Sequence, residues 1–150
     1  MKFSRESKYG LEALLHLVEQ SPGRVLTALR IAKASGVPPS FLAKIFQKFA
    51  QHGIVRSFRG ATRGYALARP ANEINLRDIL SAVEGPGLFE RCVFWDASCG
   101  EEHPCLLHDG WKRVKSEIVG FLEQTTLDDI ARSRAVSARG AGPSAPAPSR

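Results

Sequence analysis

Three helical patterns followed at once by a strand–turn–strand pattern restrict the fold more than any other feature of the chain. The first helix is predicted over 4–19 and the second over 27–35, each beginning at a serine or threonine suited to cap it. Gly36 ends the second helix, and Pro39 suits the first turn of a third helix that closes before Gly53. Two helices joined by a tight glycine-containing turn predict a helix-turn-helix.

The third helix has one apolar side and one polar side. Four apolar residues recur at the spacing of a buried stripe: Leu42, Ile45, Phe46 and Phe49. In a helix-turn-helix the second helix of the motif enters the major groove of DNA. The polar side therefore predicts DNA contacts at Ser40, Lys44 and Lys48. A small helical bundle without a DNA function would show the same pattern.

A β-hairpin is predicted directly after this helix. Residues 54–59 and 65–68 have strand character, and the glycine-containing segment 60–64 lies between them. A helix-turn-helix followed by a hairpin is a winged helix. Arginines on a projecting wing suit phosphate contact or the minor groove, so we predict DNA contacts at Arg56, Arg59 and Arg63. A wing can also serve stability alone.

The charge of the chain is unevenly distributed, although the total is +6. Residues 1–70 hold 12 Lys and Arg against 3 Asp and Glu, whereas residues 71–150 hold 9 against 12. A basic half is the electrostatic footprint of a nucleic-acid-binding domain, because phosphate neutralisation supplies the affinity that does not depend on sequence. A solvated basic face without a partner is the alternative.

All 3 cysteines lie within the seventeen residues from Cys92 to His108. Thiolates and imidazoles hold zinc and iron–sulfur clusters, and the polar Gly- and Pro-containing segment predicts a loop that can wrap around a cofactor. The gaps of six and five residues between the cysteines are unlike the Cys-x-x-Cys pairs of structural zinc sites. We therefore predict a metal or cluster site at Cys92, Cys99 and Cys105, with a cluster favoured over zinc and His108 as the candidate fourth ligand.

The choice of His108 as fourth ligand depends on the start of the following helix. If Pro104 opens that helix, Cys105 and His108 lie three residues apart on one face and reach the same cofactor. Other side chains of the loop compete for this role: Asp96, Glu101, Glu102 and His103.

The C-terminal half predicts three further helices. The first begins at Asn75. The second is long, and its apolar residues follow the spacing of a heptad seam: Leu107, Trp111, Val114, Ile118 and Phe121. Such a seam predicts a homodimer, and burial of the seam within one chain is the alternative. A short last helix begins at Thr126. We divide the chain into a winged helix-turn-helix domain (1–72), a cysteine loop with a dimerisation helix (73–133) and a disordered tail (134–150). Because helices outnumber the two strands, the predicted fold class is mainly α.

Other protein classes are disfavoured. The N-terminus lacks the apolar region of a secretory signal, and the longest apolar stretch is interrupted, so no membrane span is predicted. An odd number of cysteines without an export signal favours a reducing cytoplasm. No phosphate loop, nucleophile elbow or paired-carboxylate site indicates an enzyme.

The order of several local motifs along the chain is informative. In sequence they are Tyr9, the Gly36 turn, Gly53-Ile54-Val55, Arg59-Gly60 to Gly64-Tyr65, Ala82-Val83-Glu84-Gly85, the cysteine loop, the tryptophan-bearing helix, and Phe121-Leu122 to Thr126-Leu127. This order resembles the Rrf2 family of bacterial winged-helix transcription regulators, in the branch of IscR, NsrR and RirA. The resemblance covers about residues 1–132.

The resemblance implies a homodimer with crossing long helices, in which three cysteines hold an iron–sulfur cluster whose state controls binding to a palindromic promoter site. The ligands implied here are Cys92, Cys99 and Cys105, with His108 at the place of the histidine in IscR-like members. A 2Fe–2S cluster is favoured and a 4Fe–4S cluster is left open. In NsrR-like members an aspartate of the partner is the fourth ligand, but Lys8 stands at that position.

Three departures from the family pattern bear on function. The first cysteine gap is one residue longer than in IscR-like members, and Ala61, Thr62 and Arg63 replace the middle of the usual glycine-rich wing tip. Ala43 stands where IscR-like members place a base-reading glutamate, which implies a different target sequence.

The alternative function is a winged-helix regulator without a cluster, in which the same cysteines act as a thiol or zinc sensor. An electron-transfer protein or an enzyme built around the cluster is a further alternative.

Overall fold

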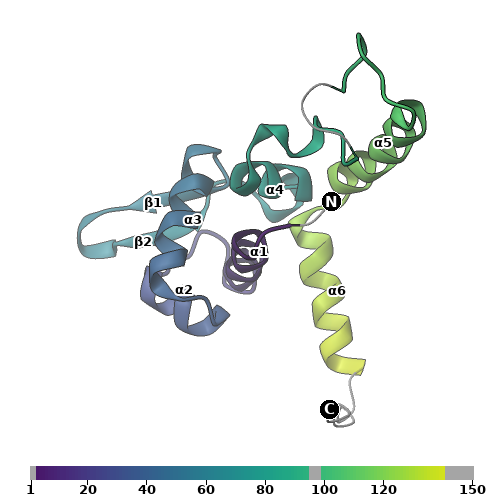
Figure 1. Ribbon diagram of the computed structural model, residues 1–150. Coiled ribbons are helices and arrows are strands. Elements are labelled where there is room, and N and C mark those ends of the chain that lie inside the picture. Colours follow the sequence, from purple (N-terminus) through teal and green to yellow (C-terminus); the bar gives the residue numbers. More distant parts are fainter. Residues whose placement is uncertain (1–2, 95–98, 141–150) are drawn as a thin grey trace, which may run out of the picture.

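The computed structural model describes residues 3–94 and 99–140 and confirms a mainly α-helical winged helix with a small β-hairpin (Figure 1). Three helices precede the hairpin and three follow it. Their bounds, in chain order, are α1 Arg5–Val18, α2 Ala28–Ser35, α3 Pro39–Gln51, β1 Val55–Phe58, β2 Gly64–Leu67, α4 Leu76–Glu84, α5 His108–Gln124 and α6 Leu127–Gly140. Single 3-10 turns lie at Gly60–Thr62, Ala71–Glu73 and Pro86–Phe89, labelled η1, η2 and η3.

The predicted helix starts of the N-terminal half are confirmed by their hydrogen bonds. The Ser4 hydroxyl accepts from the backbone N–H of Ser7 at 3.3 Å, and the Thr27 hydroxyl accepts from that of Arg30 at 3.3 Å. Gly36 ends α2 in the left-handed conformation, with φ of 70°. These local signals fix the angle at which α3 leaves the turn.

The wing is fastened to the body of the protein by β2. The two strands pair antiparallel, with Val55 opposite Leu67 and Phe58 opposite Gly64. The backbone of Tyr65 also exchanges two hydrogen bonds with Leu26, at 2.9 and 2.8 Å. A Cβ atom at Gly64 would lie 2.2 Å from the Leu26 carbonyl oxygen, so only glycine permits this approach.

Two hydrophobic clusters hold the elements together, and α4 contributes to both. The main cluster joins α1, α2, α3 and β1 and includes Ile79 and Val83 of α4. The second cluster consists of Leu80 of α4, Phe89 of η3 and Leu122 of α5. Thus α4 lies between the winged helix and α5 (Figure 1).

Two predicted helix ends are wrong. The long helix begins at His108 rather than at Pro104, and the N–H of His108 bonds to the Cys105 carbonyl at 3.0 Å in a turn. The last helix does not end near residue 133 but extends to Gly140, and the Arg134 guanidinium pairs with Glu12 of α1 at 2.9 Å. Residues 134–140 are therefore helical, whereas 141–150 lie outside the described residues.

Within the described ranges, no helix has the length and apolar character required to cross a membrane.

Candidate functional site

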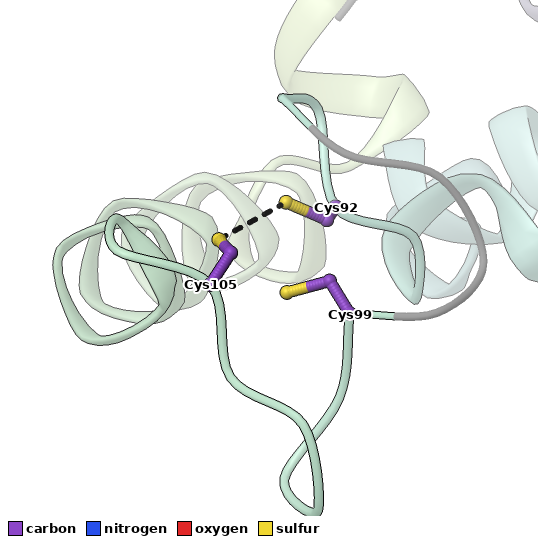
Figure 2. Close-up of side chains that lie close together, drawn as sticks. All are labelled: Cys92, Cys99 and Cys105. Carbon is purple, nitrogen blue, oxygen red and sulfur yellow. Dashed lines mark hydrogen bonds between the residues drawn. The ribbon is translucent and has the colours of Figure 1, made fainter.

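The three cysteine side chains converge in front of the N-terminal end of α5. Their sulfur atoms all lie within 4.8 Å of one another, although the residues are separated along the loop (Figure 2). The sulfurs of Cys92 and Cys105 are 4.0 Å apart. Thiols at these distances can share one metal ion or small cluster, since a metal–sulfur bond of about 2.3 Å brings its ligand sulfurs within about 4 Å. The predicted convergence of three cysteines is thus present in the structure.

The environment of Cys99 opposes the charge that a ligand must carry. A backbone hydrogen bond from Cys105 favours its thiolate, but desolvation and the neighbouring thiols of Cys105 and Cys92 outweigh that bond and raise the pKa of Cys99. Three adjacent thiols cannot all ionise without a compensating positive charge. A bound cation or an iron–sulfur core supplies such a charge.

His108 lies beside these thiols. Its Nδ1 atom is 3.5 Å from the Cys99 sulfur, and its Nε2 atom is 3.8 Å from a carboxylate oxygen of Glu101. Because α5 begins at His108, the imidazole reaches the site from the helix start rather than from a helical face shared with Cys105. The residue therefore lies where the sequence placed it, but for a different geometric reason.

The competing ligands occupy other positions. Glu101 pairs with Lys112 at 2.5 Å, and this hydrogen bond holds the pKa of Glu101 below its usual value. Glu102 and His103 are exposed at the outer end of the loop. Asp96 lies outside the described residues. Of the three that the structure describes, Glu101 lies beside His108, with its oxygen 3.8 Å from Nε2 and thus beyond hydrogen-bond distance.

Two buried nitrogen atoms in this region lack a hydrogen-bond partner among the described residues. They are Nε2 of His108 and Nε1 of Trp111. Both residues line a cavity of about 250 Å³ together with Cys92 and Cys99. A buried polar atom without a partner is costly, so an occupant with accepting or metal character fits this cavity. The sequence pattern assigned Trp111 only to the heptad seam. Its position one helical turn after His108 is the signal that could have placed it at this site.

The polar side of α3, where DNA contacts are predicted, is not uniformly exposed. Ser40 and Lys44 are exposed, as are Ala43 and Gln47 on the same helix. Lys48 instead directs its ammonium group toward α1 and α4, where Glu6 accepts from it at 2.7 Å. The structure thus groups Ser40 with Lys44 and separates Lys48 from them.

The predicted wing arginines, Arg56, Arg59 and Arg63, are all exposed. Arg69 at the end of the hairpin differs from them, because its guanidinium donates to the Gly53 and Glu73 carbonyl oxygens and pairs with Asp78 of α4 at 3.2 Å. Arg69 therefore braces the base of the wing, and the other three arginines remain accessible.

The long helix α5 presents apolar side chains to solvent. Val114 and Phe121, two positions of the predicted heptad seam, are 47% and 62% exposed. Leu122 faces inward instead and is buried against α4 and η3. The exposed side of α5 therefore has no partner within the described part of the chain.

Comparison with known proteins identifies the family. The profile of Rrf2, described as an iron-dependent transcriptional regulator, matches residues 3–133. The chain belongs to the Rrf2 family. An HTH-type transcriptional regulator of Mycobacterium tuberculosis is 33% identical over 131 residues, which cover 87% of this chain and 81% of that protein.

Two solved structures of Rrf2 regulators are similar in fold. CymR of B. subtilis, the global cysteine regulator, superposes with a TM-score of 0.72 at 25% identity, covering 89% of this chain and 98% of CymR. IscR of T. potens has a TM-score of 0.71 at 26% identity, covering 95% and 94%. The Rrf2 relatives are named as transcriptional regulators, which are not enzymes, and the family supports transcription regulation through DNA binding.

Proposed function

We propose that this Rrf2 protein is a regulator whose promoter binding is controlled by an iron–sulfur cluster. The ligands are Cys92, Cys99, Cys105 and His108. The observation that carries the proposal is the convergence of three sulfur atoms within 4.8 Å, with the Nδ1 atom of His108 at 3.5 Å from one of them. The likeness to IscR of T. potens and the iron-dependent description of the family support the same assignment.

In this proposal the protein orients the ligands and the cluster supplies redox chemistry. We favour a 2Fe–2S cluster, in which a neutral imidazole ligand would raise the reduction potential above that of an all-thiolate site. A 4Fe–4S cluster is the other candidate. A carboxylate oxygen of Glu101 lies 3.8 Å from Nε2 of His108, which is beyond hydrogen-bond distance, so Glu101 adds charge beside the ring without fixing its orientation.

DNA binding in this proposal uses the exposed residues of α3 and the wing. Ser40 and Lys44 enter the major groove, and Arg56, Arg59 and Arg63 contact phosphates or the minor groove. Lys48 is omitted from this set because its ammonium already has two acceptors inside the fold. Since loss of one phosphate contact lowers the salt slope of binding by about one, Arg63→Ala tests the role of the wing tip.

A homodimer in the cytoplasm completes the proposal. Two copies related by a twofold axis would read a palindromic site, since each recognition helix meets one half-site. The exposed apolar side of α5 is the surface proposed to join them. A reducing compartment keeps the three thiols available for the cluster.

The visible spectrum of anaerobically purified protein tests the cluster. We expect the charge-transfer bands of an iron–sulfur cluster in the wild type. His108→Ala should alter or abolish these bands while the fold is retained, and His103→Ala, the matched control in the same loop, should leave them unchanged. The reverse pattern would assign the ligand to His103. Unchanged spectra in both variants would assign it to a carboxylate or an exogenous ligand.

A second candidate is a thiol or zinc sensor on the same scaffold. The sulfurs of Cys92 and Cys105 are only 4.0 Å apart, and CymR of B. subtilis, which has a similar fold, is a global cysteine regulator. Oxidation by a peroxide would remove two electrons and two protons from the thiols and join them in a disulfide. A colourless protein that contains stoichiometric zinc, or that forms this disulfide reversibly with a change in DNA affinity, would favour this candidate over the cluster.

A further inference from the structure

We propose that Lys48 is a positioning residue that links the DNA-reading helix α3 to the start of the cysteine loop. The Lys48 ammonium donates to the Glu6 carboxylate at 2.7 Å and to the Val83 backbone carbonyl at 3.2 Å. One side chain on α3 therefore bridges α1 and the C-terminal end of α4. This role rests on the proposed function and explains a cation that the sequence assigned to DNA.

The contact with Val83 lies in the last turn of α4. The last carbonyl groups of a helix have no acceptor role within the helix itself, and a cationic side chain there is favoured by the helix dipole. Lys48 thus stabilises the final turn of α4. It can do so only while α3 keeps its present distance from that turn.

A second set of contacts fastens the same end of α4 to α1. The Glu84 carboxylate accepts from the backbone N–H of Ser4 at 2.6 Å and from the Ser7 hydroxyl at 2.5 Å. Burial opposes ionisation of Glu84, but these two hydrogen bonds and the nearby Lys48 outweigh burial and lower its pKa. Since Glu6 lies between Ser4 and Ser7 on the chain, both sets of contacts meet at the first turn of α1.

The end of α4 is also where the cysteine loop begins. The turn η3 follows directly, and its Phe89 packs with Leu80 of α4 and Leu122 of α5. Cys92 comes shortly after Phe89. A rearrangement of the cysteine loop therefore acts first on η3 and on the final turn of α4, which Lys48 joins to α3.

Replacement of Lys48 should uncouple DNA binding from the cluster without removing a phosphate contact. The matched control is Lys44, which lies one turn earlier on α3, is exposed and makes no ion pair within the described residues. Lys48→Met and Lys44→Met both remove one positive charge. They differ in whether that charge is held inside the fold.

The measurement is the affinity of the full-length protein for a promoter duplex that the wild type selects from a random-sequence library. Affinity is measured over a range of salt for the cluster-loaded and the cluster-free forms. For Lys48→Met we expect an unchanged salt slope. The ratio of the affinity of the tighter-binding form to that of the weaker-binding form should fall about fivefold. For Lys44→Met we expect an unchanged ratio and a salt slope lower by about one.

A Lys48→Met protein whose salt slope falls by one while the ratio stays at its wild-type value would overturn the proposal and make Lys48 a phosphate contact. A variant with neither change would overturn it as well. Glu6→Gln is the second test, because it removes the partner but keeps the cation, and it should reduce the ratio in the same way. A wild-type protein whose affinity does not respond to cluster loading would refute the proposed function instead, whatever the variants do.

Discussion

Replacement of Gly64 with alanine tests how the wing is held against the body of the protein. The added Cβ would lie 2.2 Å from the carbonyl oxygen of Leu26 and 3.0 Å from the backbone nitrogen of Thr27. Both atoms belong to the main chain, so no side-chain rotation relieves the contact. The strand β2 must instead move away from the segment that precedes α2.

The size of the effect follows from what this movement breaks. Tyr65 and Leu26 exchange two backbone hydrogen bonds, at 2.9 and 2.8 Å, and each is worth a net of about 1 kcal/mol. Residual strain in the displaced strand adds to their loss, for a total of about 3 kcal/mol. In a chain of 150 residues this corresponds to a fall in Tm of roughly 10 °C.

Gly60→Ala is the matched control. Gly60 also lies in the wing, with φ of 83°, but a Cβ atom there meets nothing within 4 Å. Only the cost of a left-handed alanine applies, about 1 kcal/mol. Thermal unfolding and urea unfolding, followed by circular dichroism, give both values. If Gly64→Ala destabilises the protein no more than Gly60→Ala does, the wing is not anchored through Leu26 and the reasoning is wrong.

Three further predictions concern the core, the dimer and pH. Phe46→Ala removes a fully buried ring that packs against Phe49 and Tyr65, and urea unfolding should show a loss of about 3–5 kcal/mol. The double variant Val114→Glu and Phe121→Glu places charge on the exposed side of α5 and should sediment as a monomer, so a persistent dimer would exclude this surface. Because the folded state lowers the pKa of Glu84 below the usual value of a glutamate, Glu84 contributes stability above that usual value and loses it as pH falls through the folded value. The stability difference between wild type and Glu84→Gln should therefore shrink on acidification, whereas a difference that is constant from pH 7 to pH 3 would contradict the role of its charge.

The helix starts and the wing could be predicted from sequence because their signals are local. Thr27 and Gly36 fix the ends of α2 through contacts with near neighbours along the chain. The Asn75 side chain likewise accepts from the backbone N–H of Asp78 at 2.8 Å, as the capping pattern predicted. In such cases the favoured local conformation and the native one coincide.

The errors arose where distant residues decide the conformation. Pro104 is a good first residue of a helix, but in the structure the segment that follows it brings Cys105 toward Cys92, and α5 starts only at His108. The composition after residue 133 indicated disorder, yet the helix continues and its Arg134 pairs with Glu12, which is 122 positions away.

For the candidate site, the sequence predicted which cysteines meet but not how they are surrounded. The grouping of Cys92, Cys99 and Cys105 in one loop predicted that their side chains meet, and in the structure their sulfur atoms lie within 4.8 Å of one another. Nothing in the pattern showed that Lys48 would turn to Glu6, which is 42 positions away. Nor did it show that the indole nitrogen of Trp111 would be buried with no partner among residues 3–94 and 99–140. Both facts depend on the packing of elements that no local period describes.

The contribution of α4 to both hydrophobic clusters has a consequence for the interpretation of mutants. Ile79 and Val83 complete the cluster beneath the recognition helix, and Leu80 faces the cluster beneath α5. We expect damage to either cluster to reach the other through α4, so that the two clusters unfold together. We expect a genetic screen for loss of regulation to return many core substitutions in the cysteine-bearing half that lower the folded population and imitate loss of the proposed cluster response. Protein abundance in the cell separates these substitutions from true loss of sensing.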